Sequence, residues 1–142
     1  MFSKHRSIVA ALIPAISLLA FSTANAQSSA ATANSPKAQP LLTKPLAGIN
    51  GKEALMLKVD IAPGAQSPPH RHNANTFVYV LEGSVVMQVG GQPAVTLTKG
   101  QTFYESPSDV HTVSRNPSKT ALARILVFMV KDQGAPATVP VK

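Results

Sequence analysis

The sequence predicts an all-β fold, either a β-sandwich or a small barrel. Beyond residue 26, short runs of apolar residues alternate with polar ones, as expected for half-buried strands whose side chains point to opposite faces in turn. Glycine and proline turns separate these runs at even intervals, and none of them shows a helical repeat of apolar residues. We therefore expect one all-β domain after the leader.

Residues 1–26 resemble a secretory signal peptide. Lys4 and Arg6 precede an apolar stretch over residues 8–21, and Ala24-Asn25-Ala26 supplies a small-x-small cleavage site. The apolar stretch is short for a membrane span, which needs about 20 residues, and Pro14 interrupts it. We expect cleavage near Ala26 and a periplasmic or secreted protein without a stable membrane anchor.

Three further segments are expected after the leader. Residues 27–40 are small and polar and predict a flexible linker, because they offer little to bury. Residues 41–132 contain the strand-like runs of the barrel, and residues 133–142 predict an extended C-terminal tail.

The expected strands follow from alternating or continuous apolar runs that end at turn residues. We expect the last two to pair with each other, and we expect Phe77, Tyr79 and Phe103 to pack in the core. The strands are predicted over Leu55–Ile61, Phe77–Leu81, Val85–Val89, Ala94–Leu97, Thr102–Glu105, His111–Ser114 and Ala121–Val130.

Composition narrows the function classes. The formal net charge is +7, but the lysines are scattered singly, so the sequence predicts no nucleic-acid-binding surface. Cysteine is absent, which excludes disulfides and thiolate ligands. Any bound metal must be held by nitrogen and oxygen.

All three histidines beyond the leader fit a metal site. His70 and His72 flank one residue in a loop before a strand, and His111 begins a later strand. Two residues spaced by one in extended structure point to the same side. Three neutral imidazoles can bind a divalent transition metal while leaving coordination positions open, as catalytic sites do. We predict His70, His72 and His111 as metal ligands.

Glu105 is a carboxylate in an otherwise apolar predicted strand. If Phe103 faces the barrel interior, Glu105 faces it as well. A carboxylate is costly to bury unless it meets a cation. We therefore predict Glu105 as a fourth ligand or a general base, with an exposed position at the rim as the alternative.

Two motifs resemble the cupin superfamily, a jelly-roll barrel also called the double-stranded β-helix. The pattern G-x5-H-x-H-x3,4-E-x6-G is matched by Gly64, His70-Arg71-His72 and Gly83, and the stretch 77–83 is typical of the family. The second motif is matched more loosely, by Gly100, His111 and a late Asn116. The resemblance covers residues 55–130 and implies a single-domain cupin fold.

The first motif departs from the family at its glutamate. The family's metal-ligating carboxylate falls at Thr76, next to Asn75, so only the three histidines carry over as ligands. Three alternatives stay open: Thr76, Asn75 or Glu105 could replace the missing ligand.

The resemblance implies a divalent ion, namely manganese, iron, nickel, zinc or copper, and a small organic substrate. The reaction types it implies are oxygen-dependent cleavage or oxidation, and isomerisation through a metal-stabilised enolate. The alternative to an enzyme is a non-catalytic cupin that binds or senses a small ligand after losing a full metal site. A third is a structural or storage role. We also expect a homodimer, through sheet faces that carry Val78, Val80, Val85, Val89, Ile125 and Val127.

Overall fold

The computed structural model describes residues 35–141, and every regular element within that range is a β-strand. The expected signal peptide, and the expected linker as far as residue 34, lie outside the described residues. Within the described range, no helix has the length and hydropathy needed to cross a membrane.

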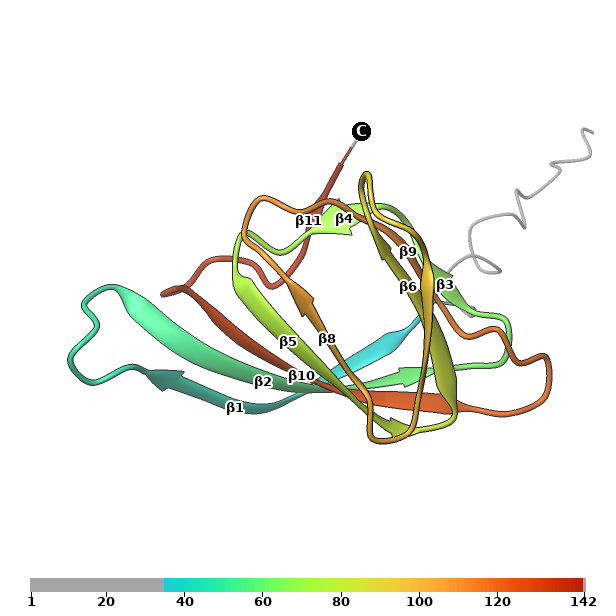
Figure 1. Ribbon diagram of the computed structural model, residues 1–142. Coiled ribbons are helices and arrows are strands. Elements are labelled where there is room, and N and C mark those ends of the chain that lie inside the picture. The colour runs from blue at the N-terminus through green and yellow to red at the C-terminus, as the bar shows by residue number, and fades with distance from the viewer. Residues whose placement is uncertain (1–34, 142) are drawn as a thin grey trace, which may run out of the picture.

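Two antiparallel sheets face each other and form the barrel, as Figure 1 shows. Sheet A has the strand order β1-β2-β10-β5-β8, and sheet B has the order β11-β4-β9-β6-β7, with β3 pairing to β9. This confirms the predicted all-β jelly roll. Sheet A consists of β1 (Lys37–Pro45), β2 (Lys52–Ile61), β5 (Asn75–Glu82), β8 (Thr102–Glu105) and β10 (Ala123–Asp132). Sheet B consists of β3 (Gln66–Ser67), β4 (His70–Arg71), β6 (Ser84–Val89), β7 (Val95–Thr98), β9 (His111–Arg115) and β11 (Val139–Pro140).

Strand β10 shows why the sequence folds into half-buried strands. Its residues alternate between buried and partly exposed along almost its whole length. Ile125, Val127 and Met129 point inward and pack against β2 and β5, which flank β10 in sheet A. β-branched residues suit such a pleated surface with one buried face. The core therefore lies between the two sheets.

The predicted pairing of the last two strands is wrong. Strand β9 pairs with β6, β4 and β3 in sheet B, whereas β10 pairs with β2 and β5 in sheet A. The chain changes sheets between them, and Asn116 stabilises this corner. Its side-chain amide donates to the carbonyls of Ile61 and Ala121 at 3.0 and 2.8 Å, and its oxygen accepts from the Ser118 amide.

Both ends of the described chain belong to the sheets. Strand β1 begins at Lys37, inside the stretch that we expected to be a linker, and pairs with β2 from Lys37 opposite Asp60. Strand β11 lies in the expected tail and pairs with β4. Every side chain of β1 is exposed, so burial left no pattern in its sequence, and backbone pairing alone defines the strand.

The aromatic residues of β5 lie outside the core, contrary to our expectation. Phe77 and Tyr79 are 47% and 44% exposed, whereas Phe103 is partly buried against the core. The inward positions of β5 are taken by Thr76, Val78 and Val80, so the intervening residues must point outward.

The same alternation affects the surface on which we expected a homodimer to form. Five of the six residues that we placed there are buried in the core and cannot contact a second copy, namely Val78, Val80, Val85, Ile125 and Val127.

Gly83 explains the tight connection from β5 in sheet A to β6 in sheet B. Its φ is +71°, and a Cβ at this position would lie 2.6 Å from the carbonyl oxygen of Leu122. Only glycine fits both the left-handed conformation and this close approach. The second glycine of the first motif is thus required by the backbone.

Candidate metal centre

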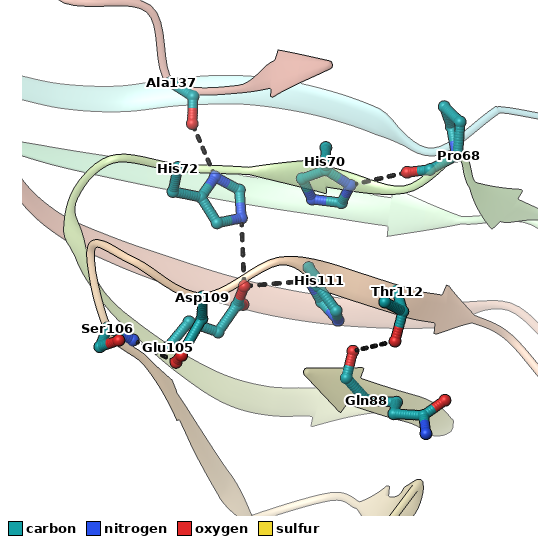
Figure 2. Close-up of polar contacts among 10 residues, drawn as sticks. All are labelled: Pro68, His70, His72, Gln88, Glu105, Ser106, Asp109, His111, Thr112 and Ala137. Carbon is teal, nitrogen blue, oxygen red and sulfur yellow. Dashed lines mark hydrogen bonds and ion pairs between the residues drawn. The ribbon is translucent and has the colours of Figure 1, made fainter. Parts of the chain in front are cut away.

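The three histidines meet at one end of sheet B. His70 lies in β4, His111 begins β9, and the two are directly paired in the register of these strands. Partners across neighbouring strands point to the same side. His72 follows β4 and, two residues from His70, returns to that side, so the period of two gathers all three rings (Figure 2).

The ring nitrogens are close enough to share one ion. One nitrogen from each of His70, His72 and His111 lies within 4.8 Å of the other two. The ring centroid of His70 lies 4.9 Å from that of His72 and 5.1 Å from that of His111. His70 and His111 are buried and His72 is partly buried. The convergence expected from the sequence is present, and the three residues could hold a metal ion.

Backbone carbonyls orient two of the three rings. Nδ1 of His70 lies 2.8 Å from the carbonyl oxygen of Pro68, and Nδ1 of His72 lies 2.6 Å from that of Ala137. A carbonyl only accepts, so Nδ1 of each ring must carry a hydrogen, and in the neutral tautomer this leaves the lone pair of Nε2 for a metal. Such second partners fix both the tautomer and the direction of a ligating imidazole.

The surroundings of His70 favour the neutral form of its ring, which is the form that binds a metal. Burial lowers the pKa of His70, and the neighbouring His72 and His111 act in the same direction, while the Pro68 carbonyl and Glu105 oppose them. A proton on the ring would compete with a metal ion for the same nitrogen.

Glu105 brings a carboxylate from sheet A to the rings of sheet B. It ends β8 and is 2% exposed, with its Oε2 atom 3.1 Å from Nδ1 of His111 and 3.6 Å from Nε2 of His72. Figure 2 shows the carboxylate between these two rings. The interior position expected for Glu105 is the one it takes, and both of its ion-pair partners are histidines that carry charge only when protonated.

A short corner places Glu105 next to His111. The carboxylate of Asp109 accepts a hydrogen bond from the Ser106 amide at 2.7 Å, and the Asp109 amide donates to the Ser106 carbonyl at 3.1 Å. The backbone hydrogen bond closes a β-turn over residues 106–109, and the Asp109 side chain binds the first amide of the same turn. The end of β8 and the start of β9 therefore lie at the same end of the barrel although they belong to different sheets.

The structure places the three residues that could replace the family's missing carboxylate at clearly different positions. Thr76 is fully buried and lies directly opposite Glu105 in the register of β5 and β8, so both side chains point inward. Glu105 therefore lies one strand away from Thr76, the position at which the resemblance places the family's carboxylate. Asn75 points outward, where its oxygen accepts a hydrogen bond from the Tyr104 hydroxyl at 2.7 Å.

The buried polar atoms without a hydrogen-bond partner are concentrated at this site. Among residues 35–141 they are Oγ1 of Thr76 and both ring nitrogens of His111. The contact between His111 and Glu105 lies within ion-pair distance but does not have hydrogen-bond geometry. Buried polar groups normally have partners. A metal ion with bound water or substrate would supply them, so the residues present fit such a group.

A cavity of about 350 Å³ adjoins the site and is lined by all three histidines and Glu105. Its wall is mostly apolar and comes from both sheets and from both ends of the described chain. A second hollow of about 370 Å³ lies over the outer aromatic residues Phe77, Tyr79 and Tyr104 and contains none of the site residues. The candidate site residues therefore face the inner cavity and not the outer hollow.

Sequence reasoning missed the backbone partners of the histidines. The carbonyls of Pro68 and Ala137 leave no signature in residue type, because every residue has one. It also missed the contribution of the C-terminal segment, whose Thr138, Pro140 and Val141 line the cavity. The pairing of β11 with β4 and the contact of His72 with the Ala137 carbonyl bring that segment to the site.

Comparisons with known proteins agree with this architecture. A family model described as "Cupin domain" matches residues 57–129. A germin-like protein 1-1 of Oryza sativa subsp. japonica is 34% identical over 97 residues, which cover 63% of this chain and 44% of that protein. The rhicadhesin receptor of Pisum sativum is 35% identical over 74 residues, 49% of this chain and 34% of the receptor. This chain spans less than half the length of both relatives.

Solved structures share the fold. A structure of oxalate oxidase superposes with a TM-score of 0.60 and 25% identity, covering 76% of this chain and 56% of that one. The DMSP lyase DddQ from Ruegeria pomeroyi DSS-3 gives a TM-score of 0.61 with 17% identity, covering 86% and 58%. At this low identity the lyase supports the fold alone.

Proposed function

Because this chain belongs to the cupin family, we propose that it binds one divalent transition metal inside its barrel and acts on a small organic molecule. The observation that carries this proposal is the cluster of three converging imidazoles and one buried carboxylate, next to a mainly apolar cavity. The reaction we propose is an oxygen-dependent oxidation or cleavage, or an isomerisation. One solved relative of similar fold is an oxalate oxidase, which is consistent with oxidative chemistry in this family.

His70, His72 and His111 would hold the ion. Nitrogen and oxygen ligands suit manganese, iron, nickel, zinc and copper, and metal analysis must decide among them. When bound, the ion supplies a Lewis acid and a template that orients a substrate oxygen. The carbonyls of Pro68 and Ala137 keep the His70 and His72 rings in the tautomer that presents Nε2.

Glu105 would serve as the fourth ligand or as the general base. Its Oε2 atom lies between two of the proposed ligands, where it could complete the coordination sphere. The same position allows it to take a proton from a substrate held by the ion, because a general base must lie within hydrogen-bond reach of that proton. Thr76, directly opposite in register, could order a water molecule with its unpaired hydroxyl.

A non-catalytic cupin that binds or senses a small ligand is the second candidate. The observation in its favour is Thr76, which replaces the carboxylate that the family uses for its metal. In that case the cavity would hold its ligand without turnover, and metal would bind weakly or not at all.

Metal content separates the two candidates. The mature protein, purified without a histidine tag, is analysed by inductively coupled plasma mass spectrometry, together with His72→Ala and His111→Ala. Arg71→Ala serves as the matched control. Arg71 lies between His70 and His72 in the sequence, and its side chain points to the opposite side of the strand. Near-stoichiometric metal in the wild type and in the control, lost in both histidine variants, supports the metalloprotein. An empty wild type supports the binding module.

We further propose that the protein is exported to the periplasm or secreted. The support is the signal-peptide pattern over residues 1–26. Cell fractionation, with and without these residues, tests the location.

The homodimer also stays a prediction. The outer face of sheet A, where Phe77, Tyr79 and Tyr104 are exposed, is an apolar surface on which it could form. Light scattering coupled to size exclusion measures the oligomeric state, and a monomer across the micromolar range contradicts the prediction.

A further inference from the structure

We propose that the inner cavity selects a mainly apolar organic molecule that carries at most one negative charge and presents a single oxygen-bearing group to the metal site. This inference rests on the proposed function, because it assigns the substrate class of the same site. It follows from the distribution of charge and apolar surface in the cavity wall.

The titratable groups of the cavity wall lie together. They are the three histidines and Glu105, whereas the rest of the wall is mainly aliphatic, with a few serine and threonine hydroxyls that carry no charge. The aliphatic side chains include Leu57, Val59, Ile61, Ile125, Val127 and Met129, from the paired strands β2 and β10. A ligand with one polar end and an apolar body would match both parts of this wall.

The wall offers no cation for a second negative charge. Among the described residues that line the cavity, none is a lysine or an arginine. A divalent ion together with ionised Glu105 leaves a net charge of +1, which one carboxylate, enolate or phenolate oxygen neutralises. A second charge on the ligand would be buried against aliphatic side chains without a partner, which is unfavourable.

The oxalate oxidase relative provides a useful contrast. Its name assigns it a small dicarboxylate substrate. Oxalate has no apolar body and carries two charges when ionised, so it would leave the aliphatic wall of this cavity without a contact. We infer a different substrate class for this chain.

A matched ligand series tests the inference. The metal-loaded protein is titrated by calorimetry with acetate, butanoate and hexanoate, and with oxalate, succinate and adipate, at constant ionic strength. We expect affinity for the monocarboxylates to rise by about fourfold for each added methylene until the cavity is filled. Succinate and adipate should each bind at least about tenfold more weakly than the monocarboxylate of equal carbon number. Oxalate can chelate the ion with both carboxylates, so it serves as a reference for contact with the metal alone.

A variant that adds a cation to the cavity wall provides a second test. Thr138 lines the cavity and is exposed, so Thr138→Lys would place a charge at the wall without disturbing the core. This variant should gain about tenfold in dicarboxylate affinity. Thr96→Lys on β7 adds the same charge away from the cavity and should leave both series unchanged. Adipate that binds as tightly as hexanoate, or affinity that does not depend on chain length, would overturn the proposal.

The two proposals fail in different ways. Metal content is measured on the same samples, so an empty protein contradicts the proposed metalloprotein directly. On metal-free protein the chain-length comparison uses the uncharged 1-butanol and 1-hexanol, because Glu105 leaves no net positive charge there for a carboxylate. An increase of affinity with length still supports an apolar ligand, and equal affinities contradict it.

Discussion

Among single residues, Glu105 has the strongest consequences for the site, because it is a buried carboxylate whose ion-pair partners are histidines. Glu105→Gln keeps the shape of the side chain and removes its charge. If Glu105 is a ligand, we expect metal affinity to fall by at least about tenfold, measured by competition with a chelator. If it is only the base, metal affinity should persist while turnover is lost.

Glu82→Gln is the control for this prediction, because Glu82 is an exposed carboxylate of the same sheet that pairs with Arg124. Glu82→Gln should change neither metal affinity nor turnover. Unchanged metal affinity and activity in Glu105→Gln would remove Glu105 from the site.

Substitutions at Thr76 test whether a carboxylate on β8 can replace one at the opposite position on β5. Thr76→Glu would place two carboxylates opposite each other in the register of β5 and β8, in a buried environment. Without metal, we expect it to lower the free energy of unfolding by several kcal/mol. The exchanged pair, Thr76→Glu with Glu105→Thr, should recover metal affinity to within about tenfold of the wild type.

Urea denaturation of the metal-free proteins and chelator competition measure these two effects. A Thr76→Glu variant as stable as the wild type, or an exchanged pair without metal, would show that the two positions are not equivalent.

At this scale the sequence predicted part of the geometry, while the roles of the residues stay predictions. The period of two placed His70 and His72 on one side, and the apolar context of Glu105 favoured the interior without excluding the rim. What the sequence lacked was the register of β5 against β8, which makes Thr76 and Glu105 neighbours. That register depends on long-range pairing and cannot be read from either strand alone.

At the scale of elements, the C-terminal segment is the least expected part of the site. The carbonyl of Ala137 orients His72, and β11 pairs with β4, which carries His70. Buried Lys131 holds the start of this segment, with its Nζ atom 2.5 Å from Glu53 and 2.6 Å from the Ala135 carbonyl. The segment therefore supports two of the proposed ligands.

Removing residues 134–142 should weaken metal binding. The truncation eliminates the Ala137 carbonyl and β11 while leaving the strands of sheet A intact. We expect a loss of about 10- to 100-fold in metal affinity, as for other partners of ligating histidines. Removal of residues 141–142 alone keeps both features and should retain most of the affinity. Equal affinity of the long truncation and the wild type would show that the segment does not position His72.

The strands themselves were predictable, whereas their partners were not. Alternation located β2, β5, β6 and β8 to within a few residues, but β9 and β10 were paired wrongly. A period of two reports which residues face inward and is silent about which strand lies alongside. In a jelly roll, consecutive strands often belong to opposite sheets, as β9 and β10 do here.

For the whole molecule, metal binding and folding should be coupled. The proposed ligands come from both sheets, since His70 and His111 belong to sheet B and Glu105 belongs to sheet A. An ion held between them would connect the two layers, and in the unfolded chain the same residues are far apart. A ligand that binds only the folded state stabilises it by about 2.7 kcal/mol at a free concentration of 100 times its Kd.

This stabilisation should raise Tm by roughly 10 °C or more for a domain of this size. Calorimetric scans of the metal-loaded protein and of the same protein after treatment with a chelator measure the shift. His111→Ala should show no shift, because it lacks a proposed ligand from β9. If only the three histidines held the ion, Glu105→Gln would show nearly the full shift, whereas a clearly smaller one indicates that sheet A supplies a ligand. A wild-type Tm that is the same with and without metal would contradict a site that spans the two sheets.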